Sequence, residues 1–152
     1  MAIRTAIRQY EGPIQPPAVD ERETAPLAPT AGPARDPLAR LDYRHARRAI
    51  ARTQAPPGHY IAFDCEDGQR LIPIEARIIH VGRGAGADLR FDDVQVSRRH
   101  AIIVRYGRHV RVLDDRSSAG TIVNGVRVIA TDLSDGDVVQ LGPIAFTYLV
   151  VR

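Results

Sequence analysis

The chain has 152 residues, 44% of them hydrophobic, and its 21 basic and 18 acidic side chains give a net charge of +3. This length fits roughly one domain of about 150 residues, and the hydrophobic share excludes a wholly disordered chain. The sequence has no apolar run near the roughly 20 residues that a membrane span needs. The single cysteine, Cys65, excludes a disulfide framework and a cysteine-based zinc site. We therefore expect a cytoplasmic protein with no membrane span.

Composition divides the chain near residue 57. Nine of the eleven prolines lie in residues 1–57, whereas residues 58–152 contain twelve arginines and twelve acidic residues. The net positive charge therefore belongs to the first part, and the second part is neutral. Because general nucleic-acid binding needs a clear excess of positive charge, we expect no nucleic-acid partner.

Residues 1–36 alternate proline with small and charged residues, which predicts a disordered Pro-rich tail. Asp36 and Pro37 then form a typical helix start, and a short basic amphipathic helix is expected over residues 37–54. Its apolar stripe is predicted to contain Leu38, Leu41, His45, Ala49 and Ile50. This helix could pack on the following domain, dock on a protein partner, or contact nucleic acid or acidic lipid.

From residue 58 onward the chain consists of short β-branched and aromatic runs between turn signals. Strands are predicted at Tyr60–Cys65, Gln69–Ile74, Arg77–Gly82, Asp88–Phe91, Ala101–Arg105, Val110–Asp114, Thr121–Val123, Arg127–Ile129, Val138–Leu141 and Ile144–Val151. About ten strands with no intervening helix indicate an all-β sandwich or barrel.

Stretches that resemble enzyme motifs lie in a sequence context that does not fit those motifs. The glycine-rich stretch 82–86 is followed by a strand and a loop, where a dinucleotide-binding loop would lead into a helix. Ser97 and His100 are close in sequence, but nothing around them resembles a nucleophile elbow. The five histidines include no His-x-x-x-His pair. We therefore predict a non-catalytic protein without a metal or other cofactor.

Three predicted loops carry arginines together with small hydroxyl residues. They contain Arg83, Ser97, Arg98, Arg99, Arg116, Ser117 and Ser118. Loops at one end of a β-sandwich can converge although they are far apart in sequence. Guanidinium and hydroxyl donors together suit an oxyanion, and phosphate on a protein side chain is the natural ligand.

These residues belong to blocks whose order and spacing resemble the forkhead-associated (FHA) domain. The blocks are Val81–Arg83, Asp88–Ala101, Ser117–Gly125 and Leu133–Gly142, and the likeness spans residues 58–152. The resemblance implies an eleven-stranded β-sandwich that binds phosphothreonine in an extended peptide. It assigns phosphopeptide binding to Arg83, Ser97, Arg98 and Ser118. It assigns loop-shaping roles to Gly82, His100, Gly120 and Asn124.

One position departs from the family pattern. Ala119 stands where the family usually has an asparagine that holds the peptide backbone beside the phosphothreonine. Losing one such hydrogen bond costs about 0.5–1.5 kcal/mol. The alternative to phosphothreonine recognition is therefore a phospho-independent interaction module whose pocket has drifted.

The tail contains one threonine in an acidic setting, Thr24, which follows Asp20, Glu21 and Glu23. Some bacterial FHA proteins are phosphorylated on such a threonine, and their tail then folds back into their own pocket. Thr24 is thus a candidate phosphorylation site and the centre of a possible intramolecular switch. The expected partners are phosphothreonine-containing protein segments and an upstream Ser/Thr protein kinase.

Overall fold

The computed structural model describes residues 37–65 and 68–152, and the side chains of its helix from Tyr43 onward. The expected tail, with Thr24, lies outside these residues. The described elements are α1 (Pro37–Thr53), β1 (Gly58–Cys65), β2 (Gly68–Pro73), β3 (Ile78–Gly82), β4 (Leu89–Arg90), β5 (Ala101–Tyr106), β6 (His109–Asp114), β7 (Thr121–Val123), β8 (Val126–Val128), β9 (Ala130–Asp132), β10 (Val138–Leu141) and β11 (Ile144–Val151). No helix among these elements is long and apolar enough to cross a membrane.

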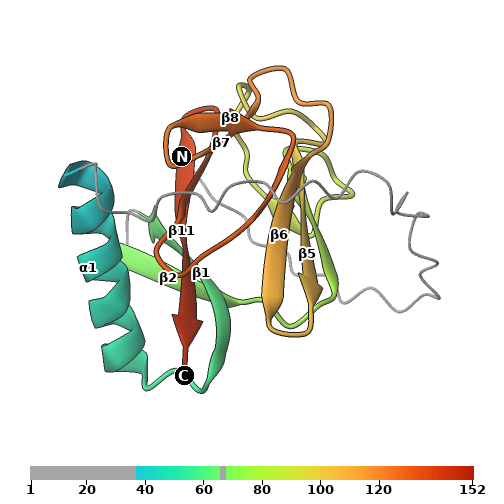
Figure 1. The fold of residues 1–152 in the computed structure, drawn as a ribbon. Helices are drawn as coiled ribbons and strands as arrows, with labels where there is room; N and C mark the ends of the chain where they lie inside the picture. The colour runs from blue at the N-terminus through green and yellow to red at the C-terminus, as the bar shows by residue number, and fades with distance from the viewer. Residues whose placement is uncertain (1–36, 66–67) are drawn as a thin grey trace.

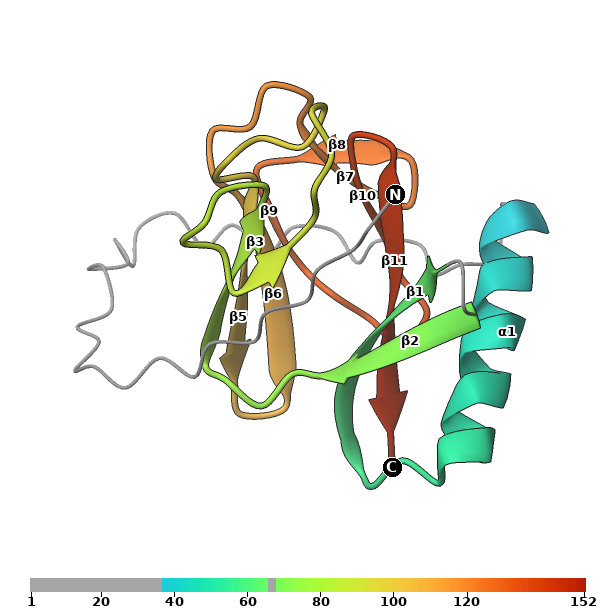
Figure 2. The ribbon, with the colours of Figure 1, turned by 180° about the vertical axis from the view of Figure 1, so that it is seen from behind.

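The strands form two sheets that pack face to face (Figures 1 and 2). One sheet has six strands in the order β2-β1-β11-β10-β7-β8, and the other has five in the order β4-β3-β5-β6-β9. Within the described sheets only the short pair of β3 and β4 is parallel. The predicted eleven-stranded β-sandwich is confirmed.

Alternation along β1 shows how the six-stranded sheet is covered on both faces. Ile61 and Phe63 face the main core between the sheets, whereas Tyr60 and Ala62 belong to a second cluster under α1. Both sets are almost completely buried. A strand covered on both faces needs a continuous apolar run, which is what the sequence of β1 contains.

Helix α1 lies along the outer face of the six-stranded sheet (Figure 1). Ala46 and Ile50 are buried in the second cluster, with Tyr43 packed against it. His45, which was predicted to lie on the apolar stripe, is exposed. The buried face is thus rotated from the predicted one, and the helix packs on its own domain.

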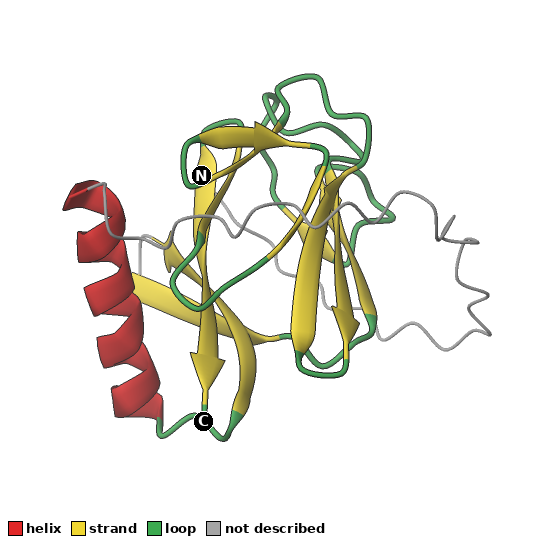
Figure 3. Ribbon diagram, viewed as in Figure 1, coloured by secondary structure: helices red, strands yellow, loops and turns green. Residues whose placement is uncertain are grey.

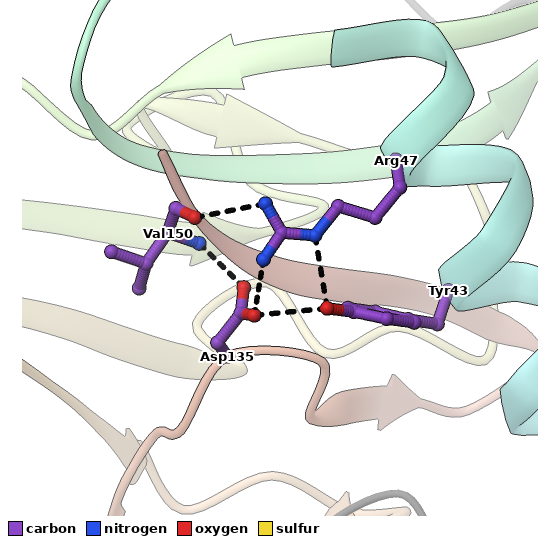
Figure 4. A network of polar contacts seen from close by, with 4 residues as sticks. All are labelled: Tyr43, Arg47, Asp135 and Val150. Atoms are coloured by element: carbon purple, nitrogen blue, oxygen red, sulfur yellow. Dashed lines mark hydrogen bonds and ion pairs between the residues drawn. The ribbon is translucent and has the colours of Figure 1, made fainter. Parts of the chain in front are cut away.

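A polar network fixes the helix to the sandwich (Figure 4). The hydroxyl of Tyr43 donates to Asp135 Oδ2 at 3.0 Å, and Arg47 forms an ion pair with the same carboxylate. Arg47 also donates to the Tyr43 hydroxyl at 2.9 Å and to the carbonyl of Val150 at 3.0 Å. The second oxygen of Asp135 accepts the Val150 N–H at 2.7 Å. One carboxylate therefore joins α1, β11 and the loop before β10.

The sequence placed one strand at residues 127–129, and the structure has two strands there. β8 pairs with β7 in the six-stranded sheet, and β9 pairs with β6 in the five-stranded sheet. Ile129 lies between them and is 86% exposed. The chain crosses from one sheet to the other at this residue, so the predicted strand overlaps β8, wrongly includes Ile129 and misses β9.

Candidate functional site

Three loops meet at one end of the sandwich. They are residues 83–88 between β3 and β4, residues 91–100 between β4 and β5, and residues 115–120 between β6 and β7. Figure 3 shows the loops in green, gathered at the end opposite the turn that joins β5 to β6. Residues from distant parts of the sequence therefore share one surface.

Two glycines let the first two loops touch through their main chains. A Cβ on Gly82 would lie 2.2 Å from the carbonyl oxygen of Arg98, and one on Gly84 would lie 2.9 Å from the same atom. The Arg83 N–H donates to the carbonyl of Ser97 at 2.9 Å, and the Gly84 N–H donates to that of Arg98 at 3.0 Å. Only a residue without a side chain fits at Gly82, as expected for a loop-shaping position.

His100 joins the second and third loops from a completely buried position. Its Nδ1 accepts the Ser97 N–H at 3.1 Å, and its Nε2 lies 2.9 Å from the carbonyl oxygen of Gly120. Since Nδ1 accepts a hydrogen bond, the proton sits on Nε2, which donates to Gly120. The imidazole thus fixes the distance between Ser97 and the loop that carries Ser118.

An open cleft of about 630 Å³ lies between the loops. It is lined by Arg83, Val94, Gln95, Val96, Ser97, Arg98, Arg116, Ser118 and Ala119. This lining contains three guanidinium groups and two hydroxyls but no carboxylate. All four residues expected to bind the phosphopeptide lie in this one cleft.

The donors in this cleft are partly anchored and partly free. Ser97 Oγ accepts the Ser118 N–H at 3.0 Å, which leaves the Ser97 hydroxyl proton able to donate. Arg83 donates through Nε to the carbonyl of Val96 at 3.2 Å. Its two terminal nitrogens bind no other residue that the structure describes. Such an arrangement presents fixed donors to an oxyanion.

Two of the seven loop residues bind acidic side chains of this chain instead of lining the cleft. Arg99 forms a bidentate ion pair with Asp115, at 2.8 Å and 3.2 Å. The Ser117 hydroxyl donates to Asp114, whose carboxylate also accepts the Thr121 hydroxyl at 2.8 Å. Burial of Asp114 favours a raised pKa, but the hydrogen bonds from Ser117 and Thr121 outweigh it and lower the pKa below its ordinary value. Arg99 and Ser117 therefore shape the loops.

Asn124 acts at a different place from the other loop-shaping residues. It adopts a positive φ of 50° in the β7–β8 turn. Its amide donates to Asp137 at 2.9 Å and accepts the Val138 N–H at 2.9 Å. It thus ties this turn to the start of β10, outside the cleft lining.

The structure adds residues that the sequence did not indicate. Gln95 and the exposed Val94 line the cleft. A second cavity of about 530 Å³ lies on the other side of Arg98, lined by the first loop, by β3 and by the Arg99–Asp115 pair. The spacing of these residues in the sequence did not indicate that they line a cavity. Over residues 37–65 and 68–152, His, Cys, Asp and Glu form no group of three or more that could hold a metal ion.

Comparison with known proteins agrees with this geometry. Residues 79–142 match the profile of the FHA domain family. The oxoglutarate dehydrogenase inhibitor of Corynebacterium jeikeium is 41% identical over 82 residues, which are 54% of this chain and 56% of that protein. Matches span between 8% and 56% of the length of the first curated relatives.

Comparison with solved structures also finds FHA domains. A domain from a study of phosphothreonine-dependent FHA domain interactions superposes with a TM-score of 0.58 and 32% identity, covering 62% of this chain and 97% of that one. Mycobacterium tuberculosis EmbR in complex with a low-affinity phosphopeptide has a TM-score of 0.56 and 31% identity, covering 61% of this chain and 25% of that one.

Proposed function

Because the chain belongs to the FHA domain family, we propose that residues 58–152 form a non-catalytic signalling adaptor that binds phosphothreonine-containing segments of partner proteins. The observation that supports this most directly is the cleft between the three loops. Arg83, Ser97 and Ser118 all border it, and its lining contains no carboxylate that would repel a dianion.

Each of these residues has a distinct role in the proposed complex. Arg83 is anchored through Nε, so its terminal nitrogens are held in place to donate to phosphate oxygens. Ser97 uses its oxygen to hold the Ser118 N–H and its proton to donate to the ligand. Arg98 adds charge at the edge of the cleft. Charge-assisted hydrogen bonds of this kind are worth about 1.5–3 kcal/mol each.

A peptide titration tests the proposal. The full chain is titrated with a phosphothreonine peptide and with its unmodified form, and only the first is expected to bind. Arg83→Ala is expected to weaken binding at least tenfold, because it removes a charge-assisted pair. Arg108→Ala is the matched control, since Arg108 lies in the turn at the opposite end of the sandwich.

The alternative function is a protein-interaction module that does not depend on phosphate. Ala119 favours it, because an alanine side chain has no group to hold a peptide backbone. Under this alternative both peptides bind equally and Arg83→Ala has little effect. Either result would overturn the proposed phosphothreonine recognition.

An intramolecular switch through Thr24 extends the proposal. Thr24 lies thirteen positions before Pro37, where α1 begins. A chain of that length spans at most about 45 Å, enough to reach across a small domain. A Ser/Thr protein kinase that acts on Thr24 would produce an internal ligand that competes with partner segments.

Phosphorylated chain tests this switch. It is expected to bind an external phosphothreonine peptide more weakly than unmodified chain, and to show shifted amide resonances at Ser97 and Ser118. Chain with Thr24→Ala is the control, because kinase treatment should leave its binding unchanged. Unchanged resonances after phosphorylation of Thr24 would exclude the switch.

A further inference from the structure

Arg127 on β8 places a guanidinium group next to the cleft. A Cβ on Gly120 would lie 2.6 Å from Arg127 Nε and 2.9 Å from Cζ, so the guanidinium lies close to the main chain of Gly120. Gly120 directly follows Ala119, which lines the cleft. Figures 1 and 2 show β8 at the same end of the sandwich as the three loops.

This guanidinium is exposed and has no acidic partner among the residues that the structure describes. Gly120 has a φ of +85°, a conformation that favours glycine, and Arg127 Nε and Cζ lie where a side chain at position 120 would begin. The Arg127 side chain makes no hydrogen bond or ion pair with any residue that the structure describes. An exposed cation next to the cleft, without a partner among the described residues, is available to a ligand.

Four arginines lie in or beside the cleft, which suits a ligand that carries more than one negative group. The two carboxylates at the start of the third loop are occupied, because Asp115 pairs with Arg99 and Asp114 accepts from Ser117 and Thr121. Arg98 and Arg116 have no ion pair with a described residue. A phosphothreonine carries about −1.5 to −2 charges at pH 7. The cluster of Arg83, Arg98, Arg116 and Arg127 therefore exceeds what one phosphate neutralises.

We propose that Arg127 makes this site selective for phosphothreonine segments that carry an acidic residue near the phosphothreonine, on the side that passes Ala119 and Gly120. This inference rests on the proposed function. The small side chain of Ala119 leaves the guanidinium uncovered, and an arginine offers a fork of donors that matches a carboxylate. A carboxylate on the ligand is thus recognised by charge at the edge of the phosphate site.

A peptide series tests the selectivity. A phosphothreonine peptide with alanine at the three positions on each side is the reference. Glutamate and glutamine are then placed in turn at each flanking position. With the full unmodified chain, glutamate is expected to bind about three- to fivefold tighter than glutamine at one position or more, the size of an exposed ion pair. The preference should shrink as salt is added.

Variants assign the preference to one residue. Arg127→Gln is expected to remove the preference for glutamate while binding the alanine-flanked reference within about twofold of the unchanged chain. Arg108→Gln is the matched control and is expected to keep the preference. Arg127→Glu is expected to reverse it, so that lysine at the same position binds tighter than glutamate. This charge reversal also separates a direct contact from a loss of folding.

The outcomes separate the two proposals. If the reference peptide binds but glutamate and glutamine are equivalent, or if Arg127→Gln keeps the preference, the role of Arg127 is overturned and phosphothreonine recognition stands. If phosphorylated and unmodified reference peptides bind equally, both proposals are overturned. A preference for glutamate that Arg127→Glu reverses supports the inference.

Discussion

Single residues in the cleft act through the hydrogen-bond capacity that the fold leaves them. His100 holds Ser97 and Gly120 with its two ring nitrogens, so both are used. Ser97 accepts from Ser118 and keeps one proton. The protein thereby uses the acceptor of Ser97 for its own loops and retains the hydroxyl donor of Ser97 for an anion. This division of roles explains why a serine suits position 97, since an alanine would lose both functions.

Ala119 is the residue at which the cleft has room for a further contact. Ala119→Asn introduces an amide that can donate to or accept from a peptide main chain at the cleft edge. We expect phosphothreonine peptide binding to tighten about two- to tenfold, as measured by calorimetry. Ala119→Asp has nearly the same shape but adds a negative charge, so it is expected to weaken binding. Equal or weaker binding by the asparagine variant would contradict a peptide path along Ala119.

The sequence indicated the site residues by type, and the structure shows the limits of this method. Arg83, Ser97 and Ser118 meet as their positions in the loops predicted. Arg99 and Ser117 are of the same types but pair with their own acids. For Ser117 the signal was present, because Asp114 lies three residues before it. Asp115 lies sixteen residues after Arg99, so sequence alone did not indicate that pair. Arg127 could not be found in this way, because its approach to Gly120 depends on the pairing of β8 with β7, which starts directly after Gly120.

At the scale of elements, period-two alternation predicts strands but not their partners. The sequence predicted one strand at residues 127–129 and none over β9, and only the pairing shows that β8 and β9 belong to different sheets. The side chain of Ile129, at the crossing, is exposed and packs into the core beneath neither sheet. A crossing of this kind is set by tertiary contacts, which local sequence does not encode.

Helix α1 shows the same limit for a helical pattern. The apolar periodicity placed His45 on the buried face, but the structure buries Ala46 and Ile50 there and half-buries Arg47. Arg47 can occupy that face because Asp135 and the Val150 carbonyl satisfy its donors. Hydropathy counts an arginine as polar, so it could not foresee a position that depends on a carboxylate far away in the sequence.

At the scale of the whole molecule, α1 covers one outer sheet face and sets where the chain before Pro37 is attached. The main core fills the space between the sheets, and α1 closes much of the outer face of the six-stranded sheet. Residues 1–36 end where α1 begins, and α1 is fixed to the sandwich by Asp135. Any segment before Pro37 is therefore tethered to a fixed point on the domain. The proposed switch through Thr24 depends on this attachment.

The acid response of the molecule follows from the charges on the ligand and on the loops. The second pKa of a phosphothreonine is about 6, so the dianion becomes a monoanion as the pH falls below that value. Binding of the phosphothreonine peptide is then expected to weaken between pH 7.5 and pH 5, in proportion to the loss of the dianion. Fluorescence anisotropy with a labelled peptide measures this change.

The fold is expected to persist across the same range. Because the pKa of Asp114 in the folded chain lies below its ordinary value, its stabilising contribution is fully present above about pH 3.9 and is lost as the pH falls through the lowered folded-state pKa. Circular dichroism should therefore report acid unfolding well below the pH at which binding weakens. Asp114→Asn removes this contribution at neutral pH, so it is expected to lower the melting temperature while the pH profile of peptide binding keeps its midpoint near 6. Loss of binding and of structure at one common pH would instead mean that the loops, and not the ligand, titrate.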